Sequence, residues 1–157
     1  MPSDPSSRKQ TEAVGLAQFS VEIAGVELGF FTGCEGLSAE YTFEEYQEGG
    51  SNGYVHKLPG RVKYANVKLT RLISPDSMKL AAWLTKFEKK ATKRDTATIT
   101  MYAGDQGSEG TGGTKICSWT LREVHPVRWT GPSFAADGNG VAKETLELAH
   151  HGFEWKA

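Results

Sequence analysis

The residues best suited to hold a metal are two adjacent histidines, His150 and His151. Neighbouring side chains on a strand point to opposite faces, so these two imidazoles cannot readily bind one ion. The two cysteines, Cys34 and Cys117, are far apart and lack the spacing of a metal site, and we expect small buried thiols rather than a disulfide. The sequence therefore predicts neither a metal centre nor a bound cofactor.

Three glutamates, Glu44, Glu45 and Glu48, could supply carboxylates for general acid or base catalysis. Nothing in the neighbouring sequence marks a second group with a shifted pKa to work with them. Ser118 lies in a strand pattern, without the Gly-x-Ser-x-Gly turn that exposes a nucleophilic serine. We interpret the glutamates as surface charge or interface contacts, and the sequence predicts that the protein is not an enzyme.

A glycine-rich stretch at residues 104–113 has the look of a phosphate-binding loop. It lacks the Gly-Lys-Ser/Thr ending that such a loop needs, and no helix pattern follows it. A flexible hairpin tip is therefore predicted rather than a nucleotide site.

Composition narrows the function classes further. The 157 residues fit one domain, and 38% hydrophobic with 24% charged residues is typical of a soluble globular protein. A net charge of -1 gives no long-range attraction for nucleic acid or anionic lipid. No apolar run approaches the roughly 20 residues that span a bilayer. Residues 1–10 lack the apolar core of a secretory signal, so we expect synthesis in the cytoplasm.

Alternating apolar and polar residues predict a mainly β protein. We expect a flexible arm at residues 1–15, rich in serine, proline and charge, and one β domain at residues 16–157. Strand patterns occupy residues 19–23, 37–47, 62–73, 96–102, 117–121, 127–130 and 141–149, with a turn at 24–26. Seven or so strands at hairpin-like spacing indicate an antiparallel sandwich or barrel.

One helix is predicted after residue 73. Ser74 can cap it, Pro75 suits its first turn, and apolar residues recur at Leu80, Trp83, Leu84 and Phe87. Its basic end is typical of a solvated helix C-terminus, and this is a simpler reading than a nucleic-acid site.

The segment from residue 48 to 60 contains too many glycines and prolines for regular core structure, and it predicts a long projecting loop or hairpin. Before it, Tyr41 and Phe43 share one face, and Tyr46 is out of phase with them, which indicates a bulge near Glu45.

Aromatic residues are dense among polar ones around this segment. We expect Phe43, Trp83 and Trp119 in the core, whereas Tyr54 and Tyr64 are harder to place there and are of a type that interfaces favour.

Several sequence blocks resemble the tail tube proteins of contractile phages, a family that includes the inner tube proteins of phage-tail-like contractile injection systems. The blocks run in order from about Phe19 to Phe153 and comprise residues 19–25, 36–37, Glu40, 46–50, 57–71, 126–132 and 144–150. The Lys57-Leu58-Pro59-Gly60 block and the Glu144-Thr145-Leu146-Glu147 strand are the most specific.

This resemblance implies a two-sheet antiparallel barrel or sandwich with one flanking helix, the tail-tube fold. It implies sixfold rings that stack into a tube around a lumen, inside a contractile sheath. The implied partners are further copies of the chain, a sheath protein, baseplate and cap or terminator proteins, and in addition a tape measure protein and lumen cargo. The implied destination is a phage tail or a phage-tail-like particle that can be released.

Contacts between subunits are expected in the hairpin, because a projecting loop can reach a neighbour. The candidate residues are Tyr46, Glu48, Gly49, Gly50, Tyr54, Lys57, Arg61, Lys63 and Tyr64. Two other classes of function stay open on the residues alone. The second hypothesis is a monomeric β-sandwich module that binds carbohydrate or protein, and the third is an enzyme.

Overall fold

The computed structural model describes residues 18–47, 49–50, 53–89, 94–103, 113–133 and 140–157. The predicted arm at residues 1–15, Glu48, nearly all of the 104–113 stretch and residues 134–139 lie outside this described part.

The described residues form ten strands and one helix. In chain order these are β1 Gln18–Ile23, β2 Val26–Phe31, β3 Gly33–Glu35, β4 Ala39–Tyr46, β5 His56–Tyr64, β6 Val67–Leu72, α1 Ser77–Lys89, β7 Asp95–Tyr102, β8 Lys115–Thr130, β9 Lys143–Ala149 and β10 Phe153–Lys156. The expected mainly β, antiparallel architecture with one helix is confirmed.

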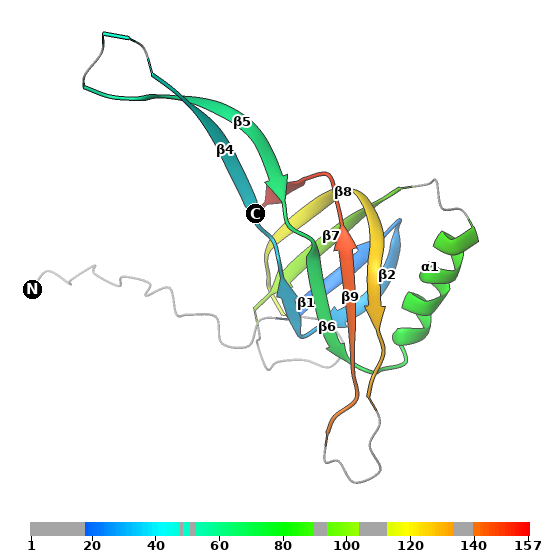
Figure 1. Ribbon diagram of the computed structural model, residues 1–157. Helices are drawn as coiled ribbons and strands as arrows, with labels where there is room; N and C mark the ends of the chain where they lie inside the picture. Colours follow the sequence, from blue (N-terminus) through cyan, green and yellow to red (C-terminus); the bar gives the residue numbers. More distant parts are fainter. Residues whose placement is uncertain (1–17, 48, 51–52, 90–93, 104–112, 134–139) are drawn as a thin grey trace, which may run out of the picture.

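One large antiparallel sheet forms the body, with the strand order β2-β1-β7-β8-β9-β6-β3 and with β10 beside β8 (Figure 1). The sheet curls so that its two end strands, β2 and β3, are separated in the chain by Thr32 alone. The Thr32 amide donates a hydrogen bond of 2.9 Å to the Thr70 carbonyl on β6. The curled sheet wraps around the core, and no ladder between the two end strands closes it into a barrel.

The long strand β8 joins the two halves of this sheet. Its first part pairs with β7 and β10, and its last part, from His125 to Thr130, pairs with β9. Between them Glu123 adopts a positive φ of 51°, which bends the strand. The prediction of two separate strands here was wrong, because apolar alternation is lost at the bend while the backbone pairing continues.

The core lies between the facing halves of the curled sheet and under α1. Val21 and Ile23 of β1 and Leu146 and Leu148 of β9 are fully buried, which confirms the alternation seen in the sequence. The predicted turn after β1 is also confirmed: Ala24 and Gly25 have φ of 54° and 76°, the conformation of a two-residue hairpin turn.

Helix α1 begins later than the sequence indicated. Ser74 and Pro75 form a tight turn. The Asp76 carbonyl is the first to accept a hydrogen bond from the amide four residues later, that of Leu80. Asp76 rather than Ser74 therefore occupies the cap position. Trp83 is buried as expected, at 5% exposure.

Three short strands, β2, β3 and β10, were not predicted. Glycine interrupts the first two in sequence: Gly29 has a φ of 90°, and Gly33 opens β3. The third is only four residues long. Short strands such as these are stabilised by tertiary pairing rather than by local propensity.

Candidate assembly interface

Strands β4 and β5 form a two-stranded sheet of their own that projects from the body (Figure 1). Their pairing runs from Ala39 opposite Tyr64 at the base to Tyr46 opposite His56 near the tip. The projecting hairpin expected from the sequence is confirmed, but the segment is more regular than predicted, because β5 continues through Pro59 and Gly60.

A β-bulge allows the strand to pass these two residues. The register shifts between Tyr41 and Phe43, so that Gly60 and Arg61 together oppose Thr42. A Cβ at Gly60 would lie 2.6 Å from Thr42 Oγ1, and the same hydroxyl donates a 2.7 Å hydrogen bond to the Arg61 carbonyl. The bulge thus lies nearer the base than the predicted position at Glu45, and it needs a residue without a side chain.

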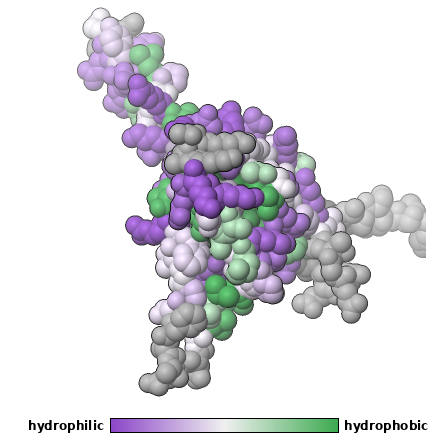
Figure 2. Space-filling view, turned by 90° about the vertical axis from the view of Figure 1, so that its right-hand side faces the viewer, coloured by the Kyte–Doolittle hydropathy of each residue, from purple (hydrophilic) through white to green (hydrophobic). Residues whose placement is uncertain are grey.

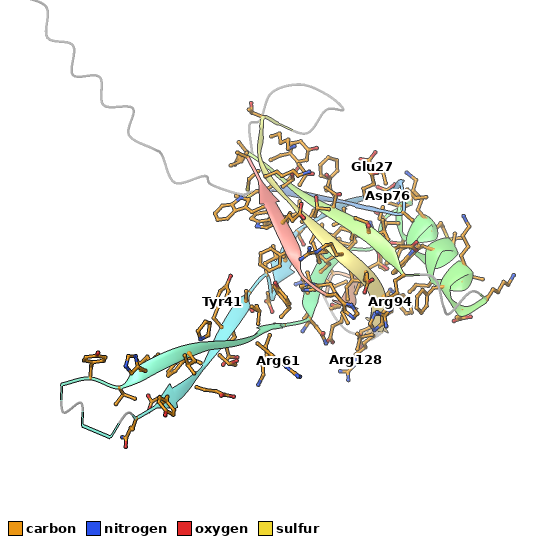
Figure 3. All side chains as sticks on the ribbon, turned by 90° about the horizontal axis from the view of Figure 1, so that it is seen from above. Glu27, Tyr41, Arg61, Asp76, Arg94 and Arg128 are labelled. Carbon is orange, nitrogen blue, oxygen red and sulfur yellow. The ribbon has the colours of Figure 1, made fainter. Side chains whose placement is uncertain are left out.

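One face of the hairpin carries exposed aromatic and aliphatic side chains. Tyr41, Phe43 and Val62 share one face and are 74%, 54% and 38% exposed. The prediction that Tyr41 and Phe43 share a face agrees with the register, but the placement of Phe43 in the core was wrong, because β4 has left the body before this residue. Figure 3 shows Tyr41 and Arg61 pointing to opposite sides of the hairpin.

The space-filling view shows that the β4–β5 hairpin projects well beyond the body. In Figure 2 hydrophobic residues are interspersed with hydrophilic ones along its surface. Tyr46 and Leu58, on the face of Arg61, are 56% and 52% exposed. Large apolar side chains are therefore exposed on both faces of a sheet only two strands wide.

The candidate residues lie at three levels of the hairpin. Gly49, Gly50 and Tyr54 are at the tip, and the Tyr54 ring meets the His56 ring edge-on at 4.9 Å between centroids. Lys57 lies lower, with its Nζ 4.8 Å from the Phe43 ring centroid.

Below the tip come Tyr46, Arg61 and Lys63, all exposed, whereas Glu48 lies outside the described residues. Tyr64 is half-buried at the base, where its ring packs against those of His150 and Phe153, with centroids at 5.6 and 5.8 Å. The structure therefore separates Tyr64 from the other candidates.

His150 fastens the base of the hairpin to the body. Its Nδ1 accepts a 3.1 Å hydrogen bond from the Gly152 amide, and its Nε2 therefore donates to the Ala65 carbonyl at 3.0 Å. Burial lowers the pKa of His150, which agrees with a neutral ring in this position. Sequence reasoning considered this histidine as a metal ligand and as part of a family block, and it missed the structural role.

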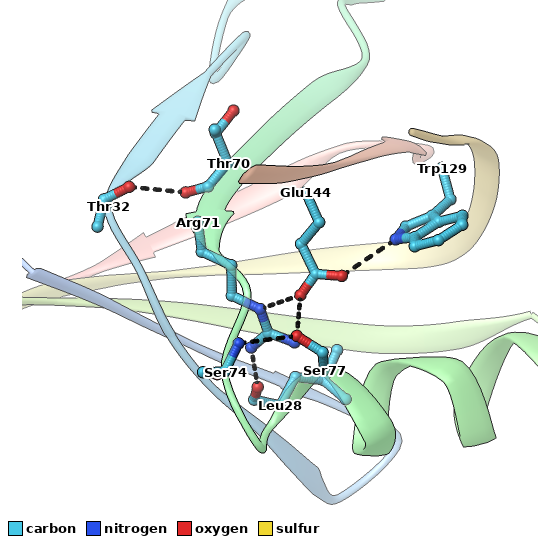
Figure 4. Close-up of polar contacts among 8 residues, drawn as sticks. All are labelled: Leu28, Thr32, Thr70, Arg71, Ser74, Ser77, Trp129 and Glu144. Atoms are coloured by element: carbon cyan, nitrogen blue, oxygen red, sulfur yellow. Dashed lines mark hydrogen bonds and ion pairs between the residues drawn. The ribbon is translucent and has the colours of Figure 1, made fainter. Parts of the chain in front are cut away.

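A buried ion pair joins several elements of the body (Figure 4). Arg71 Nε donates to Glu144 Oε1 at 2.5 Å, and the two residues are 2% and 1% exposed. The carboxylate also accepts hydrogen bonds from Ser77 Oγ at 2.7 Å and Trp129 Nε1 at 3.2 Å, while Arg71 also donates to the Leu28 carbonyl. Strands β2, β6, β8 and β9 and the start of α1 therefore meet at one charged centre.

The hydrogen bonds to Glu144 determine its ionisation. Burial acts to raise the pKa of this carboxyl, but donors from Ser77, Arg71 and Trp129 outweigh it and lower the pKa below its usual range. Both residues lie within the blocks that carry the family resemblance, and the sequence alone did not pair them.

The other groups with possible chemistry are one surface cluster and two separate thiols. His151 and Arg94 both contact the Glu123 carboxylate on the surface, the latter at 3.0 Å. Cys34 and Cys117 are free thiols, as expected, but only Cys117 is buried, and Cys34 is half-buried. Burial raises the pKa of Cys34 to about 11. Within the described ranges, no three His, Cys, Asp or Glu side chains are grouped to hold a metal ion.

The one described helix does not have the length or apolarity needed to cross a bilayer.

Solved structures share this fold. A chain of the PVC sheath-tube complex in the extended state, from an extracellular contractile injection system, has a TM-score of 0.74 at 21% identity, covering 99% of both chains. A chain of the PVC sheath/tube terminator has a TM-score of 0.69 at 24% identity, covering 89% of this chain and 94% of that one. A chain of the anti-feeding prophage baseplate has a TM-score of 0.66 at 22% identity, covering 92% and 95%.

The sequence itself matches a known family. No curated relative matches it, but the sequence model of the T4-like virus tail tube protein gp19 matches residues 16–154. Because this match spans most of the 157 residues, the chain belongs to the T4-like tail tube protein family, a family of structural proteins.

Proposed function

We propose that this chain is the inner-tube subunit of a contractile injection system or phage tail, and that it forms hexameric rings stacked around a lumen through which cargo passes. The family match and the likeness to a chain of a sheath-tube complex support the tube role. The sixfold ring is supported by the likeness to a chain of a baseplate structure described as 6-fold symmetrised.

The β4–β5 hairpin is the observation that carries the proposal. A two-stranded hairpin is marginally stable in water by itself, and this one exposes Tyr41 and Phe43 and leaves both of its outer edges unpaired among the described residues. Exposed strand edges and exposed apolar side chains promote aggregation of a monomer. Contact with neighbouring copies would cover both, and we assign the candidate hairpin residues to such contacts.

The proposed partners follow from the assemblies that contain similar chains. These are a sheath-tube complex, a sheath/tube terminator, a baseplate and a tube-terminating cap. We propose that this chain likewise contacts a sheath protein along the tube and baseplate and cap proteins at its ends. A tape measure protein and cargo are the partners proposed for the lumen.

Electron microscopy of the purified protein, or of particles from its source, tests the proposal. Rings with six subunits or stacked tubes are the expected result. A monomer at high concentration together with the absence of rings from every particle would overturn it, and would favour a monomeric binding module. Such a module would also show a rise in melting temperature with its ligand.

A further inference from the structure

A cleft of about 460 Å³ lies between helix α1 and the turn that joins β1 to β2. Its apolar lining consists of Ala24, Val26, Ala82, Trp83 and Phe87. The Trp83 and Phe87 ring centroids are 6.3 Å apart, and the Trp83 indole donates a hydrogen bond of 3.3 Å to Asp95 at the start of β7. The cleft has the volume of a ligand-binding site, and a hydrogen bond holds the largest side chain of its lining in place.

Three lysines border this apolar cleft. Lys79, Lys86 and Lys89 lie on one row of α1, with the small residue Ala82 between the first two. All three lysines are exposed. Lys79 pairs with Asp76 at 3.2 Å, whereas Lys86 and Lys89 belong to no ion pair among the described residues. The cleft therefore combines an apolar interior with a basic rim.

The stability of the helix explains only part of this basic row. Lys86 and Lys89 lie in the last turn of α1, where a cation is favourable to the helix dipole. Lys79 lies in the first turn, where a cation is unfavourable, and its exposed pair with Asp76 contributes little. Neither effect accounts for the apolar cleft beside the row, in which Val26 is 40% exposed.

The length of the basic row favours a helical segment as the occupant. From Lys79 to Lys89 the row extends over roughly 15 Å of α1, nearly three helical turns. A small anion would contact only one end of it. A helix alongside α1 can place carboxylates along the whole row and apolar side chains in the cleft. The net charge of -1 for the chain disfavours nucleic acid and anionic lipid as alternatives.

We propose that this cleft docks an acidic amphipathic helix of a partner protein. The apolar side chains of that helix enter between α1 and the β1–β2 turn, and its carboxylates pair with the three lysines. Figures 1 and 3 show α1 on the side of the body away from the β4–β5 hairpin, so this surface is separate from the subunit contacts assigned to the hairpin. The inference goes beyond the proposed function, because the cleft is complete within one subunit.

A fluorescent peptide of about 18 residues, with leucines at helical spacing and glutamates beside them, serves as the probe. A second peptide carries lysines in place of the glutamates. Fluorescence anisotropy with the full chain, dilute and unassembled, should show binding that is about tenfold or more tighter for the glutamate peptide. In NMR spectra of the full chain, the amide signals of Ala24, Val26 and Ala82 should shift as this peptide is added.

One substitution separates the apolar contact from charge attraction. Ala82→Arg fills the cleft and adds a cation, so it should lower the affinity for the glutamate peptide about tenfold, whereas charge alone would raise it. Ala81→Arg is the matched control: it places the same side chain at an exposed position outside the lining and should not lower the affinity. Arginine is a good helix former, so both variants should fold.

A charge reversal tests the lysines. Lys86→Glu with Lys89→Glu should lower the affinity for the glutamate peptide about tenfold and should weaken its dependence on salt. Lys115→Glu with Lys156→Glu makes the same change in net charge at exposed strand positions away from the cleft and should leave the affinity within about twofold.

Four outcomes would overturn the proposal: no binding of the glutamate peptide, equal affinity for the two peptides, undiminished binding by Ala82→Arg, or shifts confined to residues outside the cleft. Binding of phosphatidylserine vesicles without binding of the peptide would assign the lysine row to a lipid surface instead. All of these measurements use the unassembled subunit. Failure of the chain to form rings is a separate result, which concerns the proposed function alone.

Discussion

Arg71 and Glu144 lie directly opposite each other on β6 and β9, and their side chains form an ion pair that is almost fully removed from solvent. Through Ser77 and the Leu28 carbonyl, the pair also links α1 and the end strand β2 to β6 and β9. These contacts connect β2, at one end of the curled sheet, with β6 and β9 near its other end.

Removal of one member of this pair should destabilise the subunit. Glu144→Leu leaves the Arg71 charge buried without its partner, and we expect a loss of roughly 3–5 kcal/mol in the free energy of unfolding. Arg71→Met with Glu144→Leu should recover much of that loss. Equilibrium urea denaturation of the unassembled subunit measures both.

The surface pair between Lys79 and Asp76 provides the control, since its side chains are 54% and 40% exposed. Lys79→Met should change the free energy of unfolding by less than about 1 kcal/mol. Equal losses for the buried and exposed pairs would contradict the role assigned to Arg71 and Glu144.

Acid should weaken the subunit through Glu144. The pKa of this carboxyl is lower in the folded chain than its usual value of 4.5. The contribution of the ionised Glu144 to the free energy of unfolding is therefore complete at pH values above 4.5. It is lost as the pH falls through the lower pKa of the folded chain. Unfolding free energies measured from pH 6 downwards should fall less steeply for Glu144→Gln than for the wild-type chain, and equal slopes would exclude this source.

His150 should make the hairpin base sensitive to mild acid. The pKa of His150 is lowered from 6.5 in the folded chain. The contribution of the neutral ring to the free energy of unfolding is therefore complete at pH values above 6.5, and it is lost as the pH falls through the pKa of the folded chain. Protonation of Nδ1 also removes the acceptor for the Gly152 amide. Amide hydrogen exchange near Gly152 and Ala65 should speed up as the pH is lowered, after correction for the intrinsic rate. His56→Gln should leave this response intact, because that residue lies near the tip.

Gly60 should be required for the hairpin but not for the body. Gly60→Val would force a side chain into Thr42, because a Cβ added at Gly60 would lie only 2.6 Å from Thr42 Oγ1 and 3.0 Å from the Thr42 carbonyl oxygen. We expect assembly to fall by an order of magnitude while the melting temperature of the body changes little. Gly53→Val, at a tip position with no atom within 4 Å of the added Cβ, is the matched control. Assembly of Gly60→Val at the wild-type level would show that the bulge is dispensable.

Deletion of the outer hairpin should separate folding from assembly. A deletion of residues 49–60 alone would leave part of β4 without its partner. Removal of residues 43–59, closed by an Asn-Gly turn, takes away matched lengths of both strands. The shortened chain should keep a cooperative unfolding transition and form no stacked rings in electron micrographs. Unchanged tubes would refute the assignment of subunit contacts to this hairpin.

Local pattern was sufficient for most of the fold. Alternation in β1, β6 and β9 marked the strands and their buried faces, because one side of each lies on the core. The helix was recognised from Leu80 and Trp83, although its start was misplaced by the tight turn at Ser74. The blocks of sequence that resemble tail tube proteins are sufficient by themselves to indicate the family.

Tertiary structure decided what each residue does. Phe43 has the sequence context of a core residue, but β4 leaves the body before reaching it, and Pro59 and Gly60 continue a strand because a bulge absorbs them. The partnership of Arg71 and Glu144 spans 73 positions and depends on the register of β6 with β9. Sequence alone determined that the chain builds a β body with a projecting hairpin, since the alternation of apolar and polar residues is a local property. Which charges are buried, which aromatics stay exposed and which edges remain open are set by long-range pairing.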